Sequence, residues 1–181
     1  MTVEADWLRT FAQRYTVAWC SQNAASVAAH FAPTGSLKIN SDAPSVGRAA
    51  VAAAAQSFMT NFPDLQVLMD EVILQPGDRA IYHWTLFGTN SGPGGTGHRV
   101  RISGFEEWTF SPDGLIVQSL GHFDQALYAH QLRHGLEASG LTRHVGSRKA
   151  AQFAINNLKQ PVASRCVPEI EPHEEVGHFM R

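Results

Sequence analysis

Apolar residues recur in the first third of the chain at steps of three and four, the spacing of one face of an α-helix. The first such stripe comprises Trp7, Leu8, Phe11, Tyr15, Ala18 and Trp19. A second, short helix is expected over 23–31, ended by Pro33 and Gly35. A third helix follows Gly47 and ends before Pro63. The N-terminal third is therefore predicted to be mainly helical.

Further along, residues rich in β-branched and aromatic side chains are separated by turn-forming Gly, Pro, Asn and Asp. The predicted strands are 36–40, 64–74, 79–89, 98–110 and 115–124. A last helix is expected over 125–134, with Gly135 as its C-terminal stop. Helices followed by strands with short connections predict an α+β fold, in which the helices pack on one face of a curved, mostly antiparallel sheet.

Composition narrows the class of protein. The 181 residues carry a net charge of −2, with 44% hydrophobic and 17% charged residues. This balance gives no basic footprint for nucleic acid and no attraction to anionic membranes. No apolar run approaches the roughly 18 residues of a membrane span, and the N-terminus does not resemble a signal peptide. The two cysteines, Cys20 and Cys166, do not form a CxxC motif. A cytoplasmic location is therefore expected.

Several short motifs follow one another in a recognisable order. They are Asn61-Phe62-Pro63-Asp64, Trp84-Thr85, Gly88-Thr89-Asn90, Gly92-Pro93, Gly97-His98-Arg99-Val100, Gly104, Asp113-Gly114-Leu115-Ile116-Val117, Asp124 and Gln131-Leu132. In order and spacing, the set resembles the SnoaL-like polyketide cyclases of the nuclear transport factor 2-like superfamily. Leu120 and Asn90 depart from the residues that this family often has there, a Trp and a His.

The resemblance implies a cone-shaped α+β barrel with a deep apolar pocket, without a metal or a cofactor, and a homodimer. It also implies an acid/base Asp near the end of the last strand, which corresponds to Asp124. We expect residues 1–135 to form this domain. Residues 136–181 are expected to form a C-terminal extension, with a helix over 147–159 and then an irregular tail.

Asp124 is the first catalytic candidate. Strand alternation puts Gln118, Leu120, His122 and Asp124 on one face. If that face lines the pocket, desolvation raises the pKa of Asp124, which suits proton transfer at a carbon next to a carbonyl. The alternative is that Asp124 caps the helix that begins near Gln125. His122, the second catalytic candidate, would hold a water, orient the substrate or share the proton, unless it is a half-buried side chain without a role.

Other candidates would bind the substrate. Glu106 and Glu107 are adjacent, so one points inward as a second acid/base or an electrostatic partner, and Trp108 shares the face of Glu106. Tyr82 and His83 lie on opposite faces, and we expect His83 to reach the pocket. The full set of predicted substrate-binding residues is Tyr15, Trp19, His83, Glu106, Trp108 and Leu120.

With these candidate residues, the resemblance to SnoaL-like polyketide cyclases implies a cofactor-independent acid/base enzyme that acts on a carbonyl-bearing, apolar small molecule by aldol-type cyclisation, isomerisation or dehydration. Two alternatives stay open. One is a non-catalytic binding or dimerisation module of the same fold, and the other is a hydrolase in which Asp124 and a neighbour activate water. The expected partners are a small apolar or aromatic substrate and a second copy of the chain, rather than nucleic acid or a membrane.

Overall fold

The computed structural model describes residues 4–136, in which four helices and six strands are present. In chain order they are α1 (Ala5–Cys20), α2 (Ala24–Ala28), β1 (Phe31–Ile39), β2 (Ser45–Val46), α3 (Arg48–Asn61), β3 (Gln66–Gln75), β4 (Arg79–Thr89), β5 (Arg99–Phe110), β6 (Ile116–Phe123) and α4 (Gln125–His134). The helix predicted over 147–159, the tail and Cys166 lie outside these residues. No helix within 4–136 has the length and apolarity that crossing a bilayer requires.

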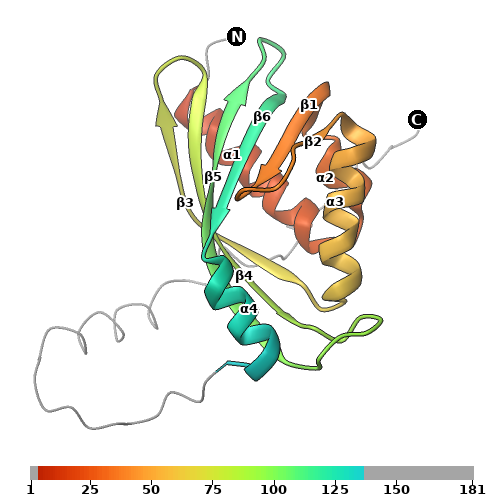
Figure 1. Cartoon of the computed structure of the whole chain (residues 1–181). Coiled ribbons are helices and arrows are strands. Elements are labelled where there is room, and N and C mark those ends of the chain that lie inside the picture. The colour runs from red at the N-terminus through yellow and green to blue at the C-terminus, as the bar shows by residue number, and fades with distance from the viewer. Residues whose placement is uncertain (1–3, 137–181) are drawn as a thin grey trace, which may run out of the picture.

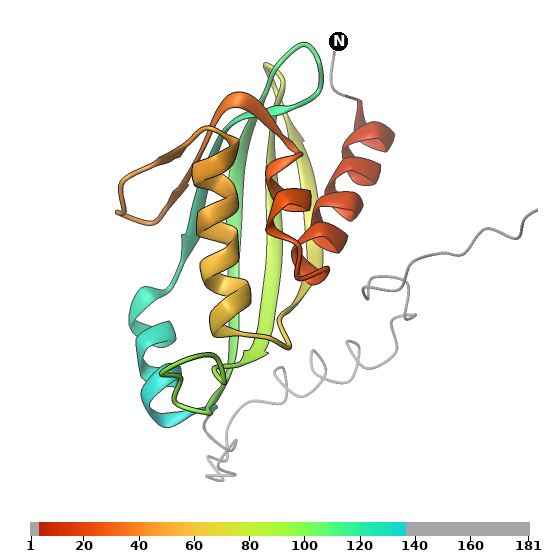
Figure 2. The same cartoon turned by 90° about the vertical axis from the view of Figure 1, so that its right-hand side faces the viewer.

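The strands form one six-stranded sheet in the order β2-β1-β6-β5-β4-β3. Every neighbouring pair is antiparallel except β1 with β6, which run parallel. Helices α1 to α3 cover one face of the curved sheet, and α4 follows β6 at one end (Figures 1 and 2). The predicted α+β class is therefore confirmed. The sheet is open at β2 and β3, so helices rather than further strand pairs enclose the interior.

The second helix and the first strand differ from the prediction. Asn23 caps α2 by accepting hydrogen bonds from two backbone N–H groups, but the helix ends at Ala28 rather than at Phe31. Phe31 instead begins β1, which continues through Pro33. The pairing of β1 with β6 shifts register between Phe31 and Ser36, and such an irregularity tolerates the missing N–H of proline.

Residues of the family-like motifs fix the loop after β4. The carboxylate of Asp64 accepts hydrogen bonds from the backbone N–H (2.6 Å) and hydroxyl (2.7 Å) of Thr89. The side-chain oxygen of Asn90 accepts from the backbone N–H of Thr96 (2.9 Å), while its amide donates to the carbonyl of Asn61 (3.3 Å). These contacts join the end of α3 to the sheet. The motifs therefore specify the fold more than they specify a reaction.

An aromatic cluster fills the interior between α1 and the sheet. Trp108 stacks on Tyr82 with ring centroids 4.7 Å apart, and Tyr15 meets Trp108 edge to face at 5.1 Å. All three side chains are buried. Offset-stacked and edge-to-face contacts stabilise aromatic pairs beyond the area that they bury. The cluster therefore forms a rigid floor between α1 and the two strands, β4 and β5, that carry Tyr82 and Trp108.

Candidate active site

An apolar cavity of about 50 Å³ lies between the sheet and the helices. Its lining residues are Trp19, Leu37, Ile39, Phe58, Val67, Tyr82, Trp84, Leu86, Ile102, Glu106, Gly121, Phe123 and Tyr128. One water molecule needs about 10–15 Å³ of such cavity volume, so the cavity is large enough to hold a small bound molecule or several waters. Among these described lining residues, Glu106 alone is a carboxylic acid, and none is a Lys, Arg or His.

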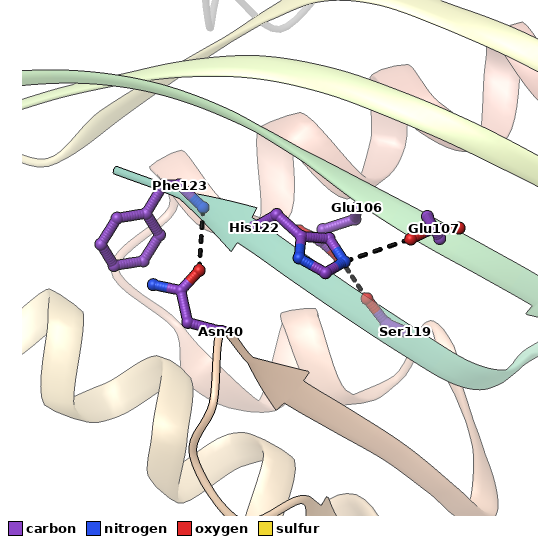
Figure 3. A network of polar contacts seen from close by, with 6 residues as sticks. All are labelled: Asn40, Glu106, Glu107, Ser119, His122 and Phe123. Carbon is purple, nitrogen blue, oxygen red and sulfur yellow. Dashed lines mark hydrogen bonds and ion pairs between the residues drawn. The ribbon is translucent and has the colours of Figure 1, made fainter. Parts of the chain in front are cut away.

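Three donors converge on one carboxyl oxygen of Glu106. Its Oε2 accepts hydrogen bonds from Ser119 Oγ (2.6 Å), Trp108 Nε1 (2.9 Å) and Tyr15 OH (3.1 Å). Figure 3 shows the contact with Ser119. Burial raises the pKa of Glu106 above its ordinary value, and the three hydrogen bonds oppose that rise. Within residues 4–136 no hydrogen bond reaches Oε1, which leaves this oxygen for a molecule in the cavity.

The alternation along β5 explains why Glu106 points inward. Ile102, Trp108 and Phe110 lie on the same face as Glu106 and are buried, whereas Glu107 is exposed. The most apolar face of a strand is the one that packs on the core. Gly121 lies opposite Glu106 on β6 and also lines the cavity. Because glycine has no side chain, the space above the carboxyl group stays open.

The predicted pocket position of Asp124 is wrong. The side chain is exposed, and its Oδ1 accepts a hydrogen bond from the backbone N–H of Leu127 (2.8 Å) at the start of α4. Asp124 is not among the residues that line the cavity. The alternative interpretation, a helix cap, is therefore confirmed. Asp124 satisfies a backbone donor that the first turn of the helix leaves without an intrahelical partner.

Three other predicted site residues lie on the outer face of the sheet. His122 Nε2 is 3.1 Å from Glu107 Oε1 (Figure 3), and its ring stacks on Phe105 at 4.7 Å. His83 approaches the other side of Phe105 at 5.8 Å. Leu120 lies opposite Glu107. None of the three lines the cavity, so their predicted places in the pocket are wrong.

The remaining predicted residues lie at or behind the cavity. Trp19 and Glu106 line the cavity, while Tyr15 and Trp108 lie behind it and donate to Glu106. Tyr82, rather than His83, is the residue of that pair that reaches the cavity. Sequence reasoning did not select Trp84, Phe123 or Tyr128 as pocket residues. The sequence contained a signal for Trp84, because strand alternation puts Trp84 on the same face as Tyr82 and Leu86.

Asp124→Ala is expected to lower the free energy of unfolding by about 1 kcal/mol, because it removes the cap of α4. Asp124→Asn is the matched control, since asparagine keeps an oxygen that can accept from Leu127. We expect it to retain nearly all of the stability in urea titrations. A loss of stability in Asp124→Asn as large as that in Asp124→Ala would contradict the assignment of Asp124 as a helix cap.

Comparison with known proteins places the chain in a family. The model of the SnoaL-like domain matches residues 12–119, which is more than half of the chain. The chain belongs to the SnoaL-like domain family. No curated protein matches this SnoaL-like protein.

Three solved structures illustrate the shared fold. TsrD from Streptomyces laurentii is 19% identical with a TM-score of 0.63, over 72% of this chain and 97% of that one. A protein with a ketosteroid isomerase-like fold from Catenulispora acidiphila DSM 44928 is 14% identical (TM-score 0.60; 72% and 93%). SalBIII, an epoxide hydrolase/cyclase-like enzyme of pyran ring formation in polyether salinomycin, is 16% identical (TM-score 0.58; 67% and 93%). At these identities the likeness is one of fold.

Proposed function

We propose that this SnoaL-like protein is an enzyme that transfers a proton at a carbon next to the carbonyl group of a small apolar substrate, with Glu106 as the acid/base. One observation carries the proposal. A carboxyl group lies buried in an apolar cavity, with three donors holding one oxygen and the other oxygen left for a ligand.

The environment of Glu106 suits both directions of proton transfer. A carboxyl group is a stronger base when its pKa is raised, and it is then also a usable acid nearer neutral pH. The three fixed donors keep the carboxyl plane in one orientation, so binding a substrate requires little rearrangement of the base. Cyclisation, isomerisation and dehydration of carbonyl compounds share this step.

The test is hydrogen–deuterium exchange at the α-carbons of 2-indanone, a small, apolar and readily enolised ketone. Proton NMR in D₂O follows the loss of the α-proton signal with and without the protein. We expect the protein to accelerate exchange above the buffer rate. Binding of 2-indanone without acceleration would overturn the proposal and favour a binding module. Opening of indene oxide to a diol that carries oxygen from labelled water, again without ketone exchange, would favour the hydrolase.

Other expectations from the sequence are untested by the described structure. The homodimer, the cytoplasmic location and the division of the chain at residue 135 stay predictions. The proposed proton transfer does not depend on them, because each group that it uses lies within residues 4–136 of one chain.

A further inference from the structure

A second residue with a polar group lines the same cavity. Within residues 4–136, Nε1 of Trp84 is the one buried side-chain nitrogen or oxygen without a hydrogen-bond partner. Trp84 also lines the cavity. An N–H group that is removed from water and left unpaired costs free energy, and native proteins pair nearly all such groups. A phenylalanine here would provide an aromatic wall without that cost. The unpaired donor therefore needs an explanation.

The indole ring of Trp84 is held in place by its neighbours. A Cβ atom on Gly104, the residue opposite on β5, would lie 2.6 Å from Cζ2 of Trp84, so only glycine lets the ring lie over that strand. The ring of Phe123 packs against Trp84 at 6.3 Å. Cζ2 belongs to the ring edge next to Nε1. The ring edge that includes Cζ2 therefore lies over Gly104 on β5, the strand that carries Glu106, and Nε1 is two bonds from Cζ2.

Strand register makes Trp84 and Glu106 diagonal neighbours on β4 and β5. Tyr82 lies opposite Glu106, and Trp84 follows two residues later on the same face. Diagonal neighbours of this kind in antiparallel strands are roughly 7–8 Å apart. A donor at Trp84 and an acid/base at Glu106 can therefore contact one small molecule at two of its atoms.

We propose that Trp84 Nε1 donates a hydrogen bond to the carbonyl oxygen of the substrate, and that Glu106 accepts the proton from the adjacent carbon. This inference rests on the proposed function and adds the substrate class, an uncharged ketone with an apolar body. The lining has no cationic side chain that could pair with a carboxylate or a phosphate. An anionic substrate would therefore be desolvated beside Glu106 without compensation.

The step balances within these groups. The α-carbon loses its proton to the carboxylate of Glu106, and the electron pair of the C–H bond forms a carbon–carbon double bond. The π electrons of the carbonyl group move to its oxygen, which becomes an enolate oxygen. The hydrogen bond from Trp84 strengthens as this charge develops, and such donors stabilise the transition state more than the ground state. Return of the proton to carbon regenerates the carboxylate.

The experiment compares two probes that differ in the carbonyl group. Full-length protein with ¹⁵N-labelled indole groups is titrated with 2-indanone and with indane, and the four indole N–H signals are followed by NMR. Trp84→Phe identifies the Trp84 signal by its loss. We expect 2-indanone to shift the Trp84 signal downfield. Indane, which has no carbonyl group, should cause no downfield shift. Trp84→Phe should weaken 2-indanone binding by up to about tenfold, the effect of one hydrogen bond, without weakening indane binding.

Trp7→Phe is the matched control, because Trp7 packs against Phe11 and Phe110 and does not line the cavity. It should leave both affinities unchanged. In the exchange assay, Trp84→Phe should lower kcat more than it raises KM, whereas a ring that only shapes the pocket would change KM alone. Failure of 2-indanone to shift the Trp84 signal at millimolar concentration overturns the inference.

The same data separate the two proposals. If the wild-type protein catalyses exchange and Trp84→Phe does so equally well, the function of Glu106 stands and the role of Trp84 fails. If the Trp84 signal shifts with 2-indanone but no exchange is catalysed, Trp84 is a ligand donor and the enzymatic proposal fails.

Discussion

Replacement of Glu106 by Gln is expected to slow α-proton exchange in 2-indanone by about 10²–10⁴-fold, the usual contribution of a positioned acid/base. Glutamine keeps the shape of the side chain and a carbonyl oxygen that can accept from Ser119, Trp108 and Tyr15. It cannot take up the proton. The loss should therefore appear in kcat, with the affinity for 2-indanone nearly retained.

The chain supplies a matched control at the next residue. Glu107 has the same side chain on the opposite face of β5, where it is exposed and contacts His122. Glu107→Gln should keep the wild-type exchange rate. Exchange that survives in folded Glu106→Gln protein, or that is lost equally in both variants, would show that Glu106 is not the base.

The raised pKa of Glu106 gives two dependences on pH with opposite signs. Exchange requires the ionised carboxylate, so its rate should rise with pH and level off, with a midpoint above the ordinary value of 4.5. The contribution of Glu106 to the free energy of unfolding should instead fall as pH rises. The folded protein binds this proton more tightly than the unfolded chain, so the stabilisation from Glu106 is full at low pH and falls as pH rises from 4.5 through the folded pKa.

Glu106→Gln removes that second dependence. The variant minus wild-type difference in free energy of unfolding should therefore become more favourable to the variant as pH rises, and then level off. Urea titrations of both proteins across this range measure it, and contributions from other titrating groups cancel in the difference. A difference in the free energy of unfolding that is independent of pH would mean that burial does not raise the pKa of Glu106. Because this measurement needs no substrate, it tests the exchange mechanism independently of the choice of ketone.

The inward orientation of Glu106 on β5 could have been predicted from the sequence, whereas the orientations of the side chains on β6 could not. On β5, alternation alone puts Glu106 with the apolar Ile102 and Trp108, and puts Glu107 with Arg101 and Ser103. The apolar side of such a strand faces the core. The alternation along β5 alone therefore predicts that the side chain of Glu106 points into the interior.

On β6 the same reasoning fails because of a local irregularity. Ile116 pairs with Phe110, but Gln118, two residues later, pairs with Thr109, only one residue earlier on β5. The extra residue on β6 reverses the alternation, as a β-bulge does. Ser119 and Phe123 then point inward, and His122 points outward. Pairing between strands creates this irregularity, so the sequence of one strand does not reveal it.

The helices show a similar division. The aromatic stripe of α1 predicted its buried face, which includes Leu8, Tyr15 and Trp19. The contact between Tyr15 and Glu106 joins residues 91 positions apart. No periodicity along the chain reports such a contact, and it depends on how α1 lies across the sheet. Local patterns thus specified the elements, and tertiary packing assembled the site.

Trp108→Ala is expected to lower the free energy of unfolding by about 3–5 kcal/mol, the range for deletion of a large buried aromatic side chain. Trp108 is 1% exposed and stacks on Tyr82. Its loss leaves a cavity in the floor of the site and removes one of the three donors to Glu106. Urea titration at fixed pH measures the change, and a loss below about 1 kcal/mol would mean that the aromatic cluster repacks.

Trp108→Phe separates the two roles of this residue. Phenylalanine keeps an aromatic ring against Tyr82 and removes the indole N–H, so it should cost less stability than alanine. The hydrogen bond from Trp108 lowers the pKa of Glu106, opposing the effect of burial. Its removal should therefore move the midpoint of the pH profile for exchange upward in Trp108→Phe. A variant that loses stability but keeps the wild-type midpoint would show that Trp108 supports the fold without tuning the carboxyl group.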